Sequence, residues 1–234
     1  MFLSDLQTNI TKKLFDSGIE TSSLDSRIIL KEIFCFDEKE LILNSQIIVP
    51  DNKINEVDEV LSRRLRGEPV SKIFGKREFY KSTFFISEDV LDPRPETELI
   101  VEIANNFILD RGYKNFIDLG TGSGCIILSI LKDNKNLSAL GIDISFKAIN
   151  IAQKNSMNLN LEKQATFIVS NWLSPISDFY DLIISNPPYI PSKDINTLAN
   201  NVKNYDPLLS LDGGDDGLKC YREIAEDINR IISK

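Results

Sequence analysis

Residues 115–124 read Asn-Phe-Ile-Asp-Leu-Gly-Thr-Gly-Ser-Gly, and residues 125–131 continue as Cys-Ile-Ile-Leu-Ser-Ile-Leu. The apolar run before the glycines predicts a buried strand, and the apolar run after them predicts a helix. Glycines between the two let the main chain turn tightly and approach a ligand without a Cβ clash. A helix that begins after such a turn presents free N–H groups to an anionic ligand group. This stretch therefore predicts a strand, a ligand-binding loop and a helix in succession.

The alternation of strand and helix continues after this stretch. Further strands are predicted at 137–144, 165–169 and 180–185, and helices at 146–157 and 217–232. Repeated strand–helix units form a parallel sheet that helices cover on both faces. Such sheets bind their ligands at the carboxyl ends of the strands. We therefore expect an α/β fold whose functional residues follow the strand ends.

The N-terminal part of the chain has a different pattern. Apolar residues at helical spacing predict helices at 6–14, 22–33 and 51–65. Apolar runs at 70–74 and 79–86 predict a small β-hairpin after them. The following stretch, Asp92-Pro93-Arg94-Pro95, is expected to be extended because each proline restricts itself and the residue before it.

These patterns predict two domains. We expect a helical domain at 1–85 that ends in the hairpin, a linker at 86–98 and the α/β domain at 99–234.

The composition excludes several classes of protein and of chemistry. Of 234 residues, 42% are apolar and 26% charged, as in globular proteins, and the net charge of −8 disfavours general attraction to nucleic acid. No apolar run reaches the ~18 residues of a membrane span, and the first residues do not resemble a secretory signal. Histidine is absent, which excludes a histidine base, nucleophile partner or metal ligand. The cysteines, Cys35, Cys125 and Cys220, form no closely spaced pair, so we expect reduced thiols in a cytoplasmic protein.

Three features at strand ends predict a site for a nucleoside-containing cofactor. The loop Gly120-Thr121-Gly122-Ser123-Gly124 has Cys125 where a dinucleotide motif has its third glycine, and this form favours S-adenosylmethionine. Asp143 ends the second strand, where a carboxylate can hold both hydroxyls of a ribose. Its alternative role is to cap the next helix, which Ser145 can also do. Trp172 follows the third strand, where it either contacts adenine or packs in the core.

The sequence Asn186-Pro187-Pro188-Tyr189 directly follows the fourth strand. Its two prolines fix the backbone and remove two N–H donors. The side-chain oxygen of Asn186 and the carbonyl of Pro187 can then accept from one amino group, while Tyr189 offers a flat apolar wall. A plain turn is the alternative, but the pattern favours a site that holds a planar NH2 group with its lone pair facing an electrophile.

Together these motifs resemble those of class I S-adenosylmethionine-dependent amino-methyltransferases. Three further stretches resemble the protein-(glutamine-N5) methyltransferases of the HemK/PrmC family: residues 68–75, Glu78-Phe79-Tyr80, and Pro93-Arg94-Pro95-Glu96-Thr97-Glu98. The resemblance extends over about residues 20–232 and implies a Rossmann-like, mostly parallel sheet with a small helical N-terminal domain that docks the substrate. The family usually has an acidic residue where Asn171 stands and an apolar one where Asp92 stands. Its members also continue beyond the position of Lys234, so we expect four strands and a sheet that is incomplete at the C-terminus.

The resemblance implies transfer of a methyl group from S-adenosyl-L-methionine to N5 of the glutamine in the Gly-Gly-Gln motif of a peptide chain release factor. It implies catalytic roles for Asn186, Pro187 and Tyr189, and substrate binding by these residues and Pro188. The implied donor-binding residues are Gly120, Thr121, Gly122, Ser123, Gly124, Asp143, Trp172 and Asn186. We expect a monomer that binds no metal, no nucleic acid directly and no membrane.

Three alternatives stay open at this point. Nucleic acid methyltransferases that act on adenine N6 or cytosine N4 use a similar motif of asparagine or aspartate, two prolines and an aromatic residue. A ribosomal-protein glutamine methyltransferase is a closer relative, and the sequence barely separates it from the first interpretation. An inactive truncated remnant is the third alternative.

Overall fold

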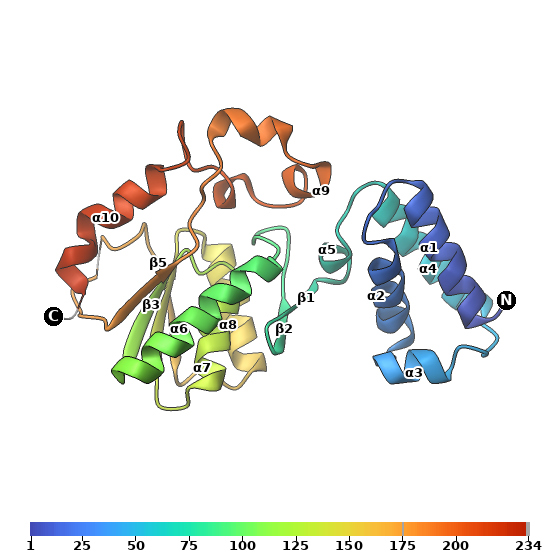
Figure 1. The fold of residues 1–234 in the computed structure, drawn as a ribbon, viewed down its shortest axis with the longest axis horizontal. Helices are drawn as coiled ribbons and strands as arrows, with labels where there is room; N and C mark the ends of the chain where they lie inside the picture. The colour runs from blue at the N-terminus through green and yellow to red at the C-terminus, as the bar shows by residue number, and fades with distance from the viewer. Residues whose placement is uncertain (175, 233–234) are drawn as a thin grey trace. The chain divides into compact units, whose positions relative to one another are not determined.

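The computed structural model describes residues 1–174 and 176–232 (Figure 1). The chain divides into two compact units, Met1–Phe74 and Gly75–Lys234. Among the described residues, no helix is both long enough and apolar enough to cross a membrane.

The first unit is a group of helices around its own apolar core. It consists of α1 (Leu3–Asp16), α2 (Ser22–Phe34), α3 (Glu38–Leu43), α4 (Asp51–Leu65) and α5 (Val70–Phe74). Leu6, Ile10 and Leu14, one helical turn apart on α1, are all buried in this core. Arg64 at the end of α4 forms an ion pair of 2.7 Å with Asp25 of α2, and only 11% and 9% of the two side chains are exposed. The basic end of α4 therefore contributes to packing within the unit.

The second unit is a parallel sheet between two layers of helices. Its strands lie in the order β5 (Ala165–Val169), β4 (Ser138–Asp143), β3 (Asn115–Leu119) and β6 (Leu182–Ser185), with every neighbouring pair parallel. Helices α6 (Glu98–Arg111), α7 (Cys125–Asp133) and α8 (Phe146–Asn158) cover one face, and α10 (Lys219–Ile231) covers the other (Figure 1). Successive residues of β3 alternate accordingly, since Phe116 packs with the first layer and Ile117 with the second. The predicted α/β fold and its parallel sheet are confirmed.

The predicted strand at 70–74 is wrong, because these residues form helix α5. A short apolar run fits either structure, and here Val70 and Phe74, one helical turn apart, pack in the core of the first unit. The hairpin forms later, from β1 (Lys76–Phe79) and β2 (Ser82–Phe85). Its turn lies inside the run that was predicted as a single strand, and Tyr80 has a φ of 52° there.

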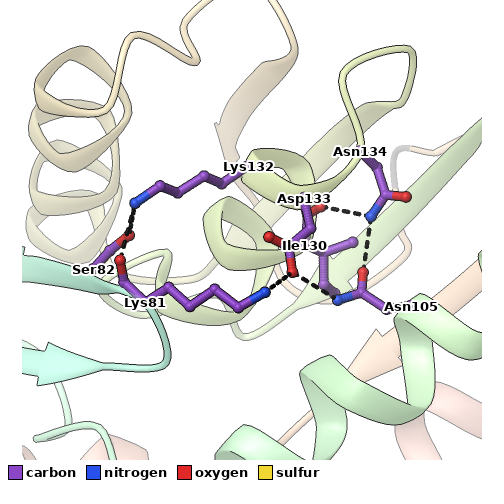
Figure 2. A network of polar contacts seen from close by, with 7 residues as sticks. All are labelled: Lys81, Ser82, Asn105, Ile130, Lys132, Asp133 and Asn134. Atoms are coloured by element: carbon purple, nitrogen blue, oxygen red, sulfur yellow. Dashed lines mark hydrogen bonds and ion pairs between the residues drawn. The ribbon is translucent and has the colours of Figure 1, made fainter.

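The hairpin is part of the second unit, so the division falls after Phe74 and not after residue 85. Phe79 and Phe84 are buried in the same core as α6 and α7. Figure 2 shows polar contacts that join the hairpin turn to the end of α7. The Nζ atom of Lys81 lies 2.8 Å from a carboxylate oxygen of Asp133, and Lys132 donates to the hydroxyl of Ser82 at 2.7 Å. Contacts between segments fifty residues apart leave no local sequence pattern that predicts them.

The segment between β6 and α10 lies beside the strand ends. It contains the 3-10 helices Ser192–Thr197 and Leu208–Ser210 and the short helix α9 (Asn200–Lys203). Backbone hydrogen bonds close it into a loop, from Ile190 to Leu211 and from Gly213 to Ile190. A further 3-10 helix, Pro95–Thr97, precedes α6. The loop after β6 and residues 88–91, which precede this 3-10 helix, form two walls of the cavity described below.

Candidate active site

A cavity of about 460 Å³ lies at the carboxyl ends of the four parallel strands. This is the position expected for an α/β fold, and the volume is typical of small-molecule sites. Six of the predicted site residues line the cavity: Gly120, Gly122, Asp143, Trp172, Asn186 and Pro188. Residues 88–91, Asn171, residues of the loop after β6 and three residues of α10, Lys219, Cys220 and Glu223, also line it.

The remaining residues of the glycine loop shape it from behind the cavity. Thr121 and Ser123 are buried and do not line the cavity. Gly124 does not line it either: a Cβ atom there would lie 3.2 Å from Cβ of Ala152 on α8. Thr121, Ser123 and Gly124 therefore do not line the cavity, and their role in donor binding stays a prediction. The structure gives them a packing role that keeps Gly120 and Gly122 at the surface of the cavity.

Asp118 anchors the loop from inside the protein. It is completely buried, and its Oδ2 atom accepts a hydrogen bond of 2.7 Å from the hydroxyl of Thr121. The pKa of Asp118 is raised to about 7, mainly by burial and also by the nearby Asp143, while the Thr121 hydrogen bond opposes the shift. Oδ1 of Asp118 has no hydrogen-bond partner among the described residues, which is compatible with a protonated carboxyl.

Asp143 faces the cavity and does not cap α8. Ser145 is the cap, since its hydroxyl accepts a hydrogen bond from the backbone N–H of Ala148. The two carboxylate oxygens of Asp143 accept from the N–H groups of Gly122 and Ser145, each at 2.9 Å. Burial raises the pKa of Asp143, and these N–H groups oppose that shift. An ionised carboxylate has about four acceptor positions, so two stay available to hydroxyl groups in the cavity.

Trp172 forms part of the cavity wall next to the glycine loop. A Cβ atom at Gly120 would lie 3.6 Å from the indole ring, so the ring packs directly over this glycine. The indole N–H donates a hydrogen bond of 2.7 Å to the carboxylate of Glu223 on α10. Glu223 was not predicted as a site residue, because nothing local links it to a residue 51 positions earlier.

A groove of about 480 Å³ adjoins this cavity, and Asn186 lines both. Pro187 and Tyr189 line this groove and not the cavity, and 59% of Tyr189 is exposed. Among the described residues, neither the amide of Asn186 nor the carbonyl of Pro187 forms a hydrogen bond. The two groups predicted to hold an amino group are thus free to do so where the two hollows meet.

A buried carboxylate, Asp206, fixes one wall of the groove, and its role was not predicted from the sequence. Asp206, in the loop after β6, accepts from the backbone N–H of Asp92 at 3.0 Å and from the guanidinium of Arg94 at 2.6 Å. Asp92 is itself buried, and its carboxylate lies 3.6 Å from the guanidinium of Arg77. The linker and the loop are therefore fixed to each other by charged hydrogen bonds. Among the described residues, no cluster of acidic or cysteine side chains is arranged to bind a metal.

Comparisons with known proteins support a common assignment for both units. The chain matches the PrmC N-terminal domain model over residues 5–75 and the methyltransferase small domain model over residues 81–205. The release factor glutamine methyltransferase of Caulobacter vibrioides is 38% identical to it, over 94% of this chain and 76% of that protein. The one of Agrobacterium fabrum is 36% identical, over 94% of this chain and 78% of that protein.

A solved structure shows the same fold at lower identity. The hMettl16 catalytic domain, in complex with MAT2A 3'UTR hairpin 6, has a TM-score of 0.51 and 17% identity, over 74% of this chain and 65% of that one. The identity to curated relatives over most of both chains, together with the two domain models, is far more specific than this likeness of fold. The chain belongs to the release factor glutamine methyltransferase family.

Proposed function

We propose that this protein transfers the methyl group of S-adenosyl-L-methionine to the side-chain nitrogen N5 of the glutamine in the Gly-Gly-Gln motif of a peptide chain release factor. The observation that carries the proposal is the position of Asn186, which lines both the cavity and the groove. A donor in the cavity and an amide in the groove would meet at this residue. The names of the curated relatives support the choice of a release factor as the substrate.

The residues of the cavity fit the proposed donor. The loop at Gly120 and Gly122, with φ values of 74° and 55°, keeps side chains away from the space that the methionine part would occupy. The two free acceptor positions of Asp143 suit the ribose hydroxyls, and Trp172 provides a flat wall for adenine. S-adenosylmethionine supplies a methyl group on a positively charged sulfur, already activated for transfer.

The residues at the groove would favour attack by the substrate amide, whose nitrogen is a weak nucleophile. Its lone pair is delocalised into the carbonyl group. Asn186 and the Pro187 carbonyl would accept the two N–H hydrogens and orient the nitrogen toward the cavity. The same two acceptors stabilise the positive charge that develops on the nitrogen, which later loses a proton to solvent. No base is needed before the attack, which agrees with a chain that contains no histidine.

The helical first unit provides a surface for the protein substrate under this proposal. It matches the PrmC N-terminal domain model and has its own core, so it is a separate module from the unit that contains the candidate site. We assign it to docking of the release factor by a monomeric enzyme. Because release factors act in translation, the cytoplasm is the proposed site of action.

Incubation with labelled methyl donor and separate candidate substrates tests the proposed function. The substrates are a release factor, the same factor with the motif glutamine replaced by alanine, ribosomal proteins and DNA. We expect label only in the unaltered release factor. Equal labelling of the altered release factor, or label in DNA or ribosomal protein alone, would reject the proposed substrate.

A further inference from the structure

Helix α10 fixes the loop that follows β5 at two points. Near the middle of α10, Glu223 accepts the hydrogen bond from the indole of Trp172. At its next-to-last residue, the guanidinium of Arg230 donates to the carbonyl of Leu173 at 2.8 Å and also to that of Ile176. The position of this loop therefore depends on α10, which packs on the same face of the sheet as the loop residues Leu173 and Ile176.

The conformation of Trp172 itself requires support. Its φ is 47°, in the left-handed region, which is uncommon and strained for a bulky residue. The hydroxyl of Ser170 donates to the Trp172 carbonyl at 3.2 Å, which fixes the main chain but leaves the ring free to turn. The indole has a single donor, and Glu223 is its acceptor. Glu223 is thus the polar contact that determines where the ring lies.

The position of the ring determines the shape of the cavity next to the glycine loop. Both Trp172 and Glu223 line the cavity, and the ring packs over Gly120. A ring released from Glu223 would leave its N–H without a partner and would be able to rotate away from Gly120 or into the cavity. Either movement changes the wall that a bound donor contacts.

We propose that Glu223 is a positioning residue of the donor site, which acts through Trp172 by holding the indole against Gly120. This inference rests on the proposed function in one respect only, the identity of the donor as S-adenosylmethionine. Its effect falls on donor binding, because the contact lies in the cavity and Glu223 does not line the groove.

Three substitutions on α10 separate this role from a general effect on the helix. Glu223→Leu removes the acceptor. Glu223→Gln keeps an acceptor oxygen of nearly the same shape without the charge. Glu226→Leu is the matched control, because Glu226 lies on the same helix, is exposed and does not line the cavity.

Calorimetric titration with S-adenosylmethionine measures the effect on the donor site. We expect Glu223→Leu to raise the Kd about tenfold, which is the weight of one hydrogen bond to a charged group. Glu223→Gln is expected to stay within about threefold of the wild type, and Glu226→Leu to bind like the wild type.

Fluorescence provides a second readout that needs no donor. Trp172 is the only tryptophan in the chain, so its emission reports this ring alone. We expect Glu223→Leu to change the emission maximum of the donor-free protein, and Glu223→Gln and Glu226→Leu to preserve it.

Two results would overturn the inference. One is Glu223→Leu with unchanged emission and unchanged Kd, and the other is an equal loss of donor affinity in Glu223→Gln and Glu223→Leu, which would indicate direct charge contact with the donor. A wild-type protein that binds no S-adenosylmethionine would contradict the proposed function instead, while the emission of the donor-free variants would still decide whether Glu223 positions the ring.

Discussion

The carboxyl group of Asp118 and the hydroxyl of Thr121 form a hydrogen bond of 2.7 Å inside the protein, directly behind the glycine loop. Both residues are buried, so this contact fixes the turn from β3 into α7 without entering the cavity. The contact links the stability of the loop to the protonation of one carboxyl group, because burial raises the pKa of Asp118 from 3.8 to about 7.

The stability of the protein is expected to fall with rising pH because of Asp118. Between the unfolded pKa of 3.8 and the folded pKa of about 7, the folded protein holds a proton that the unfolded chain has lost. The free energy of unfolding therefore decreases by up to about 1.4 kcal/mol per pH unit in this range. Asp118→Asn removes the titration, so its unfolding free energy minus that of the wild type should increase by about 2 kcal/mol from about pH 5 to about pH 7.

Urea unfolding of the two proteins in the same buffers measures this difference. Effects of titrating groups that do not interact with Asp118 cancel when the two proteins are compared at each pH. A difference that stays constant with pH would show that Asp118 is ionised in the folded protein.

Gly124→Ala is expected to destabilise the protein more than Gly122→Ala. Both glycines have positive φ, of 77° and 55°, so the backbone strain of an alanine is similar. Only at Gly124 would the new Cβ meet Ala152 and Leu128, at 3.2 Å each, whereas nothing lies within 4 Å at Gly122. We expect an additional loss of about 1–3 kcal/mol for Gly124→Ala, measured by urea unfolding. Equal losses would mean that α8 moves aside without cost.

Asp143→Ala is expected to weaken donor binding. Loss of charged hydrogen bonds to the ribose costs about 1.5–3 kcal/mol, which corresponds to a Kd about 10 to 100 times higher in calorimetry. Ser145→Ala is the matched control, since it removes the cap of α8 and about 1 kcal/mol of stability but keeps the carboxylate of Asp143. If the two variants bind the donor equally well, Asp143 has no ribose role.

Arg94→Ala is expected to impair the groove and to leave the cavity intact. The substitution removes the Arg94 guanidinium from the buried carboxylate of Asp206, so the loop after β6 loses one attachment to the linker. We expect a KM for the release factor about tenfold higher, with the Kd for S-adenosylmethionine unchanged. A rise in the donor Kd with no change in the KM for the release factor would reverse the assignment of the two hollows.

Strand positions were predicted best where a short apolar run is bounded on both sides by turn-forming or polar residues. The strands at Asn115–Leu119 and Ala165–Val169 have the predicted bounds, because each is a short apolar run that turn-forming or polar residues enclose. The motifs that follow strand ends were brought together as predicted, since parallel strands place their carboxyl ends at one edge of the sheet.

The failures have two physical causes. Val70–Phe74 is too short for its period to show, and its helix is decided by packing against the rest of the first unit. Glu223, Arg94 and Asp206 act through partners 51 to 114 positions away, and such pairs leave no signal in a single sequence. The donor-binding roles of Thr121, Ser123 and Gly124 stay predictions, since these residues belong to the predicted loop but do not line the cavity.

The measurement that bears most directly on the proposed chemistry compares donor binding and methyl transfer in Asn186→Ala. The substitution removes one of the two acceptors at the junction of cavity and groove, while Gly120, Gly122 and Asp143 stay in place. We expect a donor Kd close to that of the wild type and a loss of about 3 kcal/mol in transition-state stabilisation, which is more than a hundredfold in kcat. Asn186→Asp keeps acceptor oxygens at this position and should retain more activity than Asn186→Ala. Wild-type turnover of the release factor by Asn186→Ala would contradict the central role of Asn186.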